Sequence, residues 1–484
     1  MTVTAPSSSA TSGSSSGAPA WFPGFQSLEV EHRDEVSLPV EGTAPPEIAG
    51  TLYRNGPARH EVYGDRYRHW WDGDGMVHGL RIEGGRVGYR NRFVDTAKKR
   101  AEDAAGRRIH ASFGTPPPGG PIDRIRNFKP GNTASVNVVH HAGRLLALTD
   151  GGRPHQLDPE TLETLGGGEL SLGLLTSADT FTAHPKLHPD TGDLIGYGMR
   201  PGPRPRLKLY RITATGEASH FATLGTAGFV HDFALTATKA VFAIGRAGGF
   251  SPAMFGFLLG RKSVYDSMSF EAGPADIWTV DLATGTVECH PAPDGLLGFS
   301  HVANAFDTDD GGLAVDYVHY PDVEIIHQMT DVMAGRETDF TRARAARLEV
   351  SPTGATTTTE LAGCGWEFPR CIDDVATREH TTQWGVTGYL GSPVRIDDDG
   401  TVDICPLGPG EFAGEPIPVP KRGATAERDA WILTVVMVND GGEDAPRSEL
   451  RILDGADLQA PAVAVARLPN VMPFDFHGSF VPAT

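Results

Sequence analysis

The chain has 484 residues, and its 42 Lys and Arg face 61 Asp and Glu, which gives a formal net charge of −19. This balance disfavours a nucleic-acid-binding protein, because such a protein needs a basic surface that displaces counterions. Apolar residues make up 39% and charged residues 21%, an ordinary globular composition that excludes wholesale disorder. The 59 Gly and 37 Pro predict many turns and few long helices.

The beginning of the chain differs in composition from the rest. Residues 1–20 are rich in Ser, Ala, Thr and Gly, without a basic start or an apolar stretch, and this predicts a disordered leader, not a signal peptide. We expect one catalytic domain over residues 21–484, starting with the aromatic residues from Trp21 onward. No apolar run approaches the roughly 20 residues that a membrane-spanning helix needs.

The cysteines point to a reducing compartment and a cytoplasmic location. Four cysteines in a chain of this length are too few for a disulfide framework. They form no CxxC pair, so a structural zinc site is not expected. The four are Cys289, Cys364, Cys371 and Cys405.

Short alternating apolar runs, separated by turns, recur along most of the chain. They predict half-buried strands joined in hairpins, with turns around Asp158, Asp281, Ser351, Asp398 and Asp454. Hairpins over more than 400 residues suit an all-β propeller, which packs each sheet against its neighbours. A large sandwich with insertions is the competing interpretation. Helical patterns are few and cover residues 96–106 and 324–335.

Four of the 18 histidines stand beside apolar or aromatic strand-like segments. They are far apart along the chain, and no local zinc motif such as HExxH contains them. Ligands of this kind must converge from distant parts of the fold, and a propeller allows this because its inner strands meet at the axis. The histidines are His184 in TFTAHPKLHP, His231 in GFVHDFALT, His301 in GFSHVANAF and His477 in MPFDFHGSF.

These four segments, in this order, resemble the iron-ligand segments of the carotenoid cleavage oxygenase family. Further similar segments are GTLYRNGP from residue 50, HWWDGDGMVHGL from 69, RNRFVDT from 90, LDPETLET from 157 and WEFPR from 366. The resemblance extends over residues 22–482, nearly the whole chain. It implies a seven-bladed β-propeller with a loop and helical cap over an axial metal site.

The resemblance also implies one Fe(II) per chain, held by His184, His231, His301 and His477. Four neutral imidazoles suit Fe(II) and leave coordination positions open for O2. In this family carboxylates accept the outward ring N–H of the ligand histidines, which fixes their tautomer and raises their basicity. Segment matching places these carboxylates at Asp150, Glu367 and Glu415.

Asp150 departs from the family, which usually has Glu at this position. Because Asp is one methylene shorter, we expect it to contact its histidine weakly, through a water or after a backbone shift. Val136 matches a position where relatives place a small β-branched residue near the open iron site. Simple packing is the alternative role for Val136.

Two features bear on the substrate. Stilbene-cleaving relatives usually carry Lys immediately before the first of these carboxylates, whereas this chain has Thr149. The aromatic residue often found after Thr96 is also missing, since the sequence continues with AKKRAE. Both differences favour a carotenoid or apocarotenoid over a hydroxystilbene.

An apolar polyene also needs an entrance from the membrane in which it dissolves. A candidate doorway for substrate and membrane is followed by Arg261 and Lys262, a combination typical of interfacial segments. A buried loop is the alternative, and the net charge of −19 predicts that any membrane contact is weak and hydrophobic. The doorway residues are Met254, Phe255, Phe257, Leu258 and Leu259.

The sequence therefore predicts an Fe(II)-dependent oxygenase that uses O2 to split a conjugated C=C bond of a carotenoid or apocarotenoid into carbonyl products. Stilbene cleavage or a retinoid-type isomerisation on the same fold are the alternatives. From a different class, a propeller hydrolase or binding module holding another metal such as Ca(II) remains open, although Ca(II) prefers oxygen ligands. The oligomeric state stays undetermined.

Overall fold

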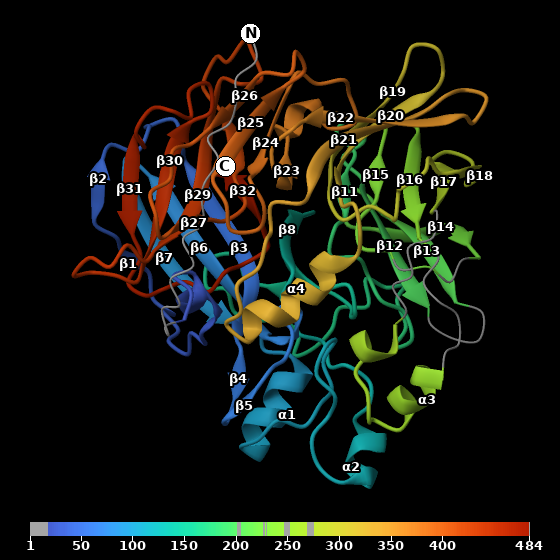
Figure 1. Ribbon diagram of the computed structural model, residues 1–484, viewed down its shortest axis with the longest axis vertical. Helices are drawn as coiled ribbons and strands as arrows, with labels where there is room; N and C mark the ends of the chain where they lie inside the picture. The colour runs from blue at the N-terminus through green and yellow to red at the C-terminus, as the bar shows by residue number, and fades with distance from the viewer. Residues whose placement is uncertain are drawn as a thin grey trace.

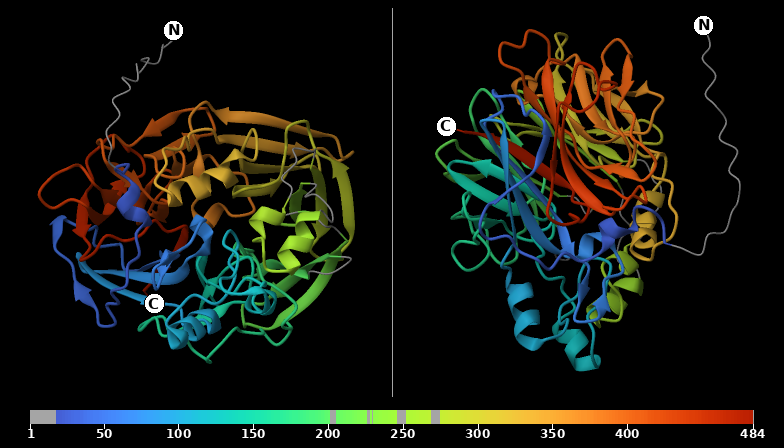
Figure 2. Two further views of the ribbon diagram at one scale, coloured as in Figure 1. Left: turned by 60° about the horizontal axis from the view of Figure 1, so that its bottom comes forward. Right: turned by 90° about the vertical axis from the view of Figure 1, so that its left-hand side faces the viewer.

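The computed structural model describes residues 18–200, 205–225, 228, 230–245, 252–268 and 275–483. Nearly all of the predicted leader lies outside these ranges. Seven sheets of three to six strands are arranged around a common axis as a seven-bladed β-propeller (Figures 1 and 2). The propeller prediction is therefore confirmed, and the sandwich alternative is wrong.

Each blade is an antiparallel sheet; in blades 2 to 6 the first strand in sequence is innermost, whereas in blade 1 the C-terminal strand β32 is innermost. The first three blades, written from the inner strand outward, are formed as follows. Blade 1 holds β32 (His477–Pro482), β3 (Gly50–Arg59), β6 (Asp74–Glu83), β7 (Arg86–Phe93) and β1 (Val36–Ser37); blade 2 holds β8 (Asn137–His141), β9 (Arg144–Leu148) and β10 (His155–Leu157); blade 3 holds β11 (Lys186–Leu187), β12 (Leu194–Arg200), β13 (Arg206–Ile212) and β14 (Ala218–Leu224).

The remaining four blades follow the same order. Blade 4 holds β15 (Ala234–Leu235), β16 (Lys239–Ile244), β17 (Asp276–Asp281) and β18 (Val287–Pro291); blade 5 holds β19 (Val302–Asp307), β20 (Leu313–His319), β21 (Arg344–Val350) and β22 (Thr356–Ala362); blade 6 holds β23 (Glu367–Arg370), β24 (Thr382–Val386), β25 (Pro393–Asp397) and β26 (Val402–Ile404); blade 7 holds β28 (Ile417–Pro420) and β27 (Glu411–Ala413), both on β29 (Ala430–Val438), then β30 (Arg447–Asp454), β31 (Ala464–Arg467) and β2 (Val40–Gly42). The hairpins predicted at Asp281, Ser351 and Asp398 are confirmed as β17–β18, β21–β22 and β25–β26.

Between every pair of neighbouring blades lies a separate apolar cluster. Leu52 and Leu80 of blade 1, for example, pack against Leu433 and Leu450 of blade 7. Six further clusters join the other neighbouring pairs around the ring. Burial of apolar surface on both faces of each sheet explains why the strands are rich in Val, Leu, Ile and Ala.

The ring closes by pairing the two ends of the chain. In blade 1 the C-terminal strand β32 pairs antiparallel with β3, and Asn55 lies opposite His477. The outermost strand of blade 7, β2, likewise comes from the N-terminal part of the chain and pairs with β31. Residues more than 400 positions apart therefore lie side by side (Figure 1).

Short helices and a small hairpin lie beyond one end of the blades and form a cap (Figures 1 and 2). The two predicted helices are confirmed as α1, capped by Thr96 and ended by the left-handed Gly106, and α4. None of the helices in the described residues is long and apolar enough to cross a membrane. The elements are η1 (Phe22–Phe25), β4 (Glu61–Val62), β5 (Asp65–Arg66), η2 (Trp70–Asp72), α1 (Ala97–Ala105), α2 (Pro121–Arg126), α3 (Pro252–Leu258), η3 (Tyr265–Ser267) and α4 (Glu324–Met333), while η4 (Asp373–Val375) lies within blade 6.

A methyl group added at Gly478 tests the ring closure. A Cβ at this position would lie 2.1 Å from the carbonyl oxygen of Tyr53, which is fixed in β3. We expect Gly478→Ala to destabilise the fold by about 1–3 kcal/mol, the usual cost of overpacking. Thermal unfolding measures the effect, and Gly168→Ala, which meets no atom within 4 Å, is the matched control. Equal melting temperatures for the two variants would contradict this account of the closure.

Candidate metal centre

The predicted histidines occupy equivalent places in four blades. His477 is the first residue of β32, and His184, His231 and His301 come one to three residues before β11, β15 and β19. Inner strands of a propeller begin at the same level near the axis, so these side chains meet there although the chain separates them widely. Blades 6 and 7 have Glu367 and Glu415 at the corresponding places.

The four imidazole rings converge closely. The nitrogens of His184, His231 and His301 that face one another lie within 4.8 Å of each other, and the Nε2 atoms of His231 and His301 are 3.3 Å apart. The ring of His477 lies 4.6 Å from that of His184 and 4.8 Å from that of His301, centroid to centroid. The structure therefore brings all four predicted histidines together.

Asp150 holds His231 directly, which corrects the expectation of a weak or water-mediated contact. Its Oδ2 accepts a hydrogen bond of 2.8 Å from Nδ1 of His231. Its Oδ1 accepts the backbone N–H of Ala183 at 2.9 Å. Asp150 follows β9 by two residues and thus joins blade 2 to the segments that precede β11 and β15. Although burial acts against protonation, the Asp150 carboxylate raises the pKa of His231.

Glu367 holds His301 from a fully buried position. Its Oε2 accepts Nδ1–H of His301 at 2.6 Å and the N–H of Phe368 at 2.8 Å. Its Oε1 accepts the hydroxyl of Tyr320 at 2.5 Å. Burial alone would raise the pKa of Glu367, but His301 and these donors lower it, so the group is a carboxylate.

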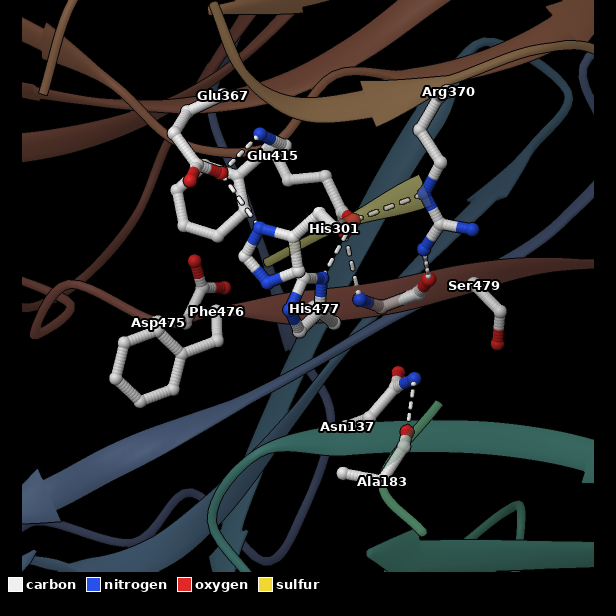
Figure 3. A network of polar contacts seen from close by, with 12 residues as sticks. Asn137, Ala183, His301, Glu367, Arg370, Glu415, Asp475, Phe476, His477 and Ser479 are labelled. Carbon is white, nitrogen blue, oxygen red and sulfur yellow. Dashed lines mark hydrogen bonds and ion pairs between the residues drawn. The ribbon is translucent and has the colours of Figure 1, made fainter. Parts of the chain in front are cut away.

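Glu415 holds His477 within a buried network of ions (Figure 3). Its Oε1 accepts Nδ1–H of His477 at 2.9 Å and Nε–H of Arg370 at 2.9 Å. Its Oε2 accepts Arg54 at 2.6 Å, and Arg54 in turn makes two 2.7 Å bonds to Asp475. Burial would raise the pKa of Glu415, but Arg370 and His477 hold it far below its usual range.

Sequence reasoning did not assign Arg54, Arg370 and Asp475 to the site. The signal was available for all three, since Arg54, Arg370 and Asp475 lie inside the segments GTLYRNGP, WEFPR and MPFDFHGSF. A buried carboxylate that stays ionised needs a compensating charge, and Arg is the usual partner. The resemblance identified the segments, but only the fold places both guanidinium groups on Glu415.

The donor set fits a metal cation. Each of the three carboxylates faces a histidine Nδ1, and a neutral ring that donates from Nδ1 has its Nε2 lone pair free to bind a metal. His184 Nε2 is buried and has no hydrogen-bond partner among the described residues. Burial lowers the pKa of His184 and takes that of His477 to about 4, so both are neutral near pH 7. A cation between the rings would satisfy these orphaned atoms.

Aromatic side chains of the cap and blades cover two of the rings. Trp71 stacks on His231 with parallel planes, and Phe368 stacks on His301. Trp71 also contacts Phe113, whose carbonyl oxygen accepts the N–H of Tyr265. One side of the site is therefore an apolar aromatic wall.

Comparison with known proteins agrees with this geometry. The family model described as Retinal pigment epithelial membrane protein matches residues 25–482. The chain belongs to this family. Its members include the carotenoid cleavage oxygenases that the sequence resembles, and the chain is an enzyme of that group.

Individual relatives cover nearly the full chain. Apocarotenoid-15,15'-oxygenase of Synechocystis sp. is 32% identical over 99% of both chains. Isoeugenol monooxygenase of Pseudomonas nitroreducens is 28% identical over 93% of this chain and 95% of its own. The solved structure of cobalt-substituted Synechocystis apocarotenoid oxygenase superimposes with a TM-score of 0.85 at 29% identity, covering 96% of this chain and 98% of the other. The family thus spans several substrates on one fold.

The direct bond of Asp150 predicts that losing this carboxylate costs as much metal affinity as losing Glu367. An Asn at this position has one acceptor for two donors, His231 Nδ1–H and Ala183 N–H, so one contact must be lost. We expect Asp150→Asn and Glu367→Gln each to lower metal affinity by about 10–100-fold, the typical cost of losing such a partner. Metal content after dialysis against a graded chelator measures both. Asp150→Asn with unchanged affinity would contradict a direct structural role.

Proposed function

We propose that the chain is a non-haem Fe(II) oxygenase that cleaves a conjugated C=C bond of an apocarotenoid or carotenoid to carbonyl products. The four converging imidazoles of His184, His231, His301 and His477 support this most strongly, because an all-nitrogen set held by carboxylates suits Fe(II) better than Ca(II). Iron bound there would supply the activation of O2. The protein itself positions the ligands and the double bond and excludes water.

Blade 2 is the blade that has neither a histidine nor a glutamate at this position. Val136 comes just before β8, so it holds in blade 2 the position that histidines hold in neighbouring blades. Its side chain packs against the apolar cluster around Leu146 and Leu148 and offers no donor atom. We assign to Val136 the wall of the open coordination side, where its bulk limits how the substrate approaches.

The two lysines of α1 are already engaged, which favours an apolar substrate over a phenol. Lys98 Nζ donates to Tyr67, Asp74 and Glu102 at 2.6–3.0 Å in a buried cluster. Lys99 pairs with Asp103 on the surface. Neither ammonium is available to bind a phenolate, and Thr149 offers no charge. The aromatic wall of Trp71, Phe113 and Tyr265 instead suits a polyene.

The candidate doorway is more sharply defined in three dimensions. Phe255 is 66% exposed and Leu258 is also exposed, whereas Phe257 packs edge-on against Phe128. Met254 and Leu259 are partly buried. Of the five predicted doorway residues, Phe255 and Leu258 are therefore the exposed ones.

Helix α2 adds a second exposed apolar pair. Ile122 is 67% exposed and Ile125 is exposed beside it. The two helices are neighbours, since a Cβ on Gly260 would lie 2.4 Å from the carbonyl oxygen of Arg124 (Figure 1). We call Ile122, Ile125, Phe255 and Leu258 the apolar tip. From α3 the chain continues to Tyr265 in the aromatic wall, so the apolar tip and the aromatic wall are neighbours along the chain.

Exposed cations surround the apolar tip although the whole chain is acidic. They are Arg126, Lys129, Arg261 and Lys262. Apolar side chains rimmed by Lys and Arg are typical of interfacial segments, and each cation near an anionic surface contributes about 1 kcal/mol. We therefore propose peripheral contact with a membrane through the apolar tip, with local charge aiding the hydrophobic contact.

The metal assignment is tested by substitution at a ligand. His301→Ala removes one of four ligands, and we expect loss of bound iron and of oxidative cleavage. Metal analysis and product mass spectrometry with a panel of apocarotenals, carotenoids and stilbenes measure both. His220→Ala, an exposed histidine of β14, is the control and should leave both unchanged. An active enzyme purified without iron, or stilbenes as the preferred substrates, would overturn the respective part of the proposal.

The membrane contact is tested at the apolar tip. Phe255→Asp with Leu258→Asp places two charges at the interface, and we expect liposome binding to fall while iron content stays unchanged. Val402→Asp, at an exposed apolar residue of β26, is the matched control. Sedimentation with neutral and anionic liposomes measures the effect. Equal binding of the double variant and the control would remove the membrane assignment.

A further inference from the structure

A cavity of about 380 Å³ lies on the propeller axis, on the other side of the histidines from the aromatic wall. Its inner end is lined by His184, His301 and His477. Its lining then follows the inner strands β8, β11, β19 and β32 away from the histidines. The exposed Leu187 and Asp373 also line it, so the cavity reaches solvent.

The lining of this axial cavity mixes apolar side chains with polar and charged ones, and its charged groups are slightly acidic in sum. The carboxylates of Asp232, Asp373 and Glu415 face the cations of Lys186 and Arg370. Lys186 pairs with Asp232 at 2.9 Å and Arg370 with Glu415 at 2.9 Å. Two of the three carboxylates are thereby neutralised, and Asp373 near the mouth supplies the excess negative charge.

The two sides of the metal centre therefore differ in whether a hydrated metal ion can cross them. On the cap side Trp71 and Phe368 stack on the ligand rings, and an ion crossing that wall would lose hydration without replacement. On the axial side a hydrated cation meets amides, hydroxyls and carboxylates, including Asn137 and Ser479. The polyene and the metal ion thus require different routes.

We propose that the axial cavity is the route by which the divalent metal ion enters and leaves the four-histidine site. This inference rests on the proposed metal centre. An entry route affects only the activation barrier that the metal ion crosses on its way in and out. An obstruction therefore slows metal uptake and metal release by the same factor and leaves the metal affinity unchanged. Damage to a metal-binding histidine would instead change the ratio of the release rate to the uptake rate, which is the metal affinity.

Cys371 provides the handle for a test, because its partly buried side chain lines the cavity immediately after β23. In the metal-loaded protein, iron release to a coloured chelator and reloading with Co(II) give the two rates. We expect Cys371→Trp to slow both by about tenfold, a barrier increase of ~1.4 kcal/mol. Cys371→Ser should change neither rate.

A reversible obstruction guards against a variant that fails to fold. A methanethiosulfonate reagent converts the Cys371 thiolate to a mixed disulfide with release of methanesulfinate, and dithiothreitol removes the group again. We expect modified wild-type protein to release and take up metal slowly until dithiothreitol is added. The same treatment of Cys371→Ser leaves only the other thiols, including the exposed Cys289 of β18, and should have no effect.

The charge at the mouth gives an independent measurement. We expect Asp373→Lys to slow Co(II) uptake about threefold at low ionic strength and less at high salt, because screening weakens attraction of a cation beyond a few ångströms. Unchanged rates in Cys371→Trp and in the modified protein, or failure of the reagent to reach Cys371, would overturn the route. A change in affinity without matched rates would also overturn it. A parent protein that binds no metal would instead overturn the metal centre itself.

Discussion

The pairing of β32 with β3 is the contact on which the rest of the structure depends. It closes the ring, and closure sets every inner strand at the same distance from the axis. His477 begins β32, so the strand that completes blade 1 also delivers one of the four imidazoles. A propeller that stayed open at this seam would have three histidines and no fixed centre. Stability and the candidate site are thus coupled through one antiparallel ladder.

The three carboxylates around the centre perform the same task in different electrical surroundings. Glu367 is fully buried and is satisfied by hydroxyl and backbone donors, whereas Glu415 is compensated by two arginines. Asp150 is 32% exposed and accepts one backbone N–H beside its histidine. At Glu367 and Glu415 these partners lower the pKa against the effect of burial, since an unpaired buried charge would be too costly. The ligand orientations therefore do not depend on a single type of partner.

The two sides of the histidine ring divide the tasks of the enzyme. Aromatic side chains from the cap cover one side and lead towards the apolar tip, which suits a substrate that is poorly soluble in water. The other side opens into the axial cavity, where charged and polar groups stand among apolar ones. A single opening would have to admit both a polyene and a hydrated ion, and the linings that favour these two oppose each other. The propeller resolves this because its axis has two ends.

The sequence by itself predicted the propeller, the hairpins at Asp281, Ser351 and Asp398, and helices α1 and α4, and its resemblance to a family indicated the four histidines, because alternation, turn residues and family segments are local signals. It also indicated the carboxylates Asp150, Glu367 and Glu415. Only the tertiary structure decided that Asp150 bonds His231 directly, since the two residues are 81 positions apart and meet only in the fold. The hydrogen bond from Arg54 to Glu415 likewise joins residues far apart in the chain. The same holds for the contact between α2 and the end of α3 at the apolar tip. Such contacts depend on how the blades and the cap pack against one another, and no local sequence pattern predicts that packing.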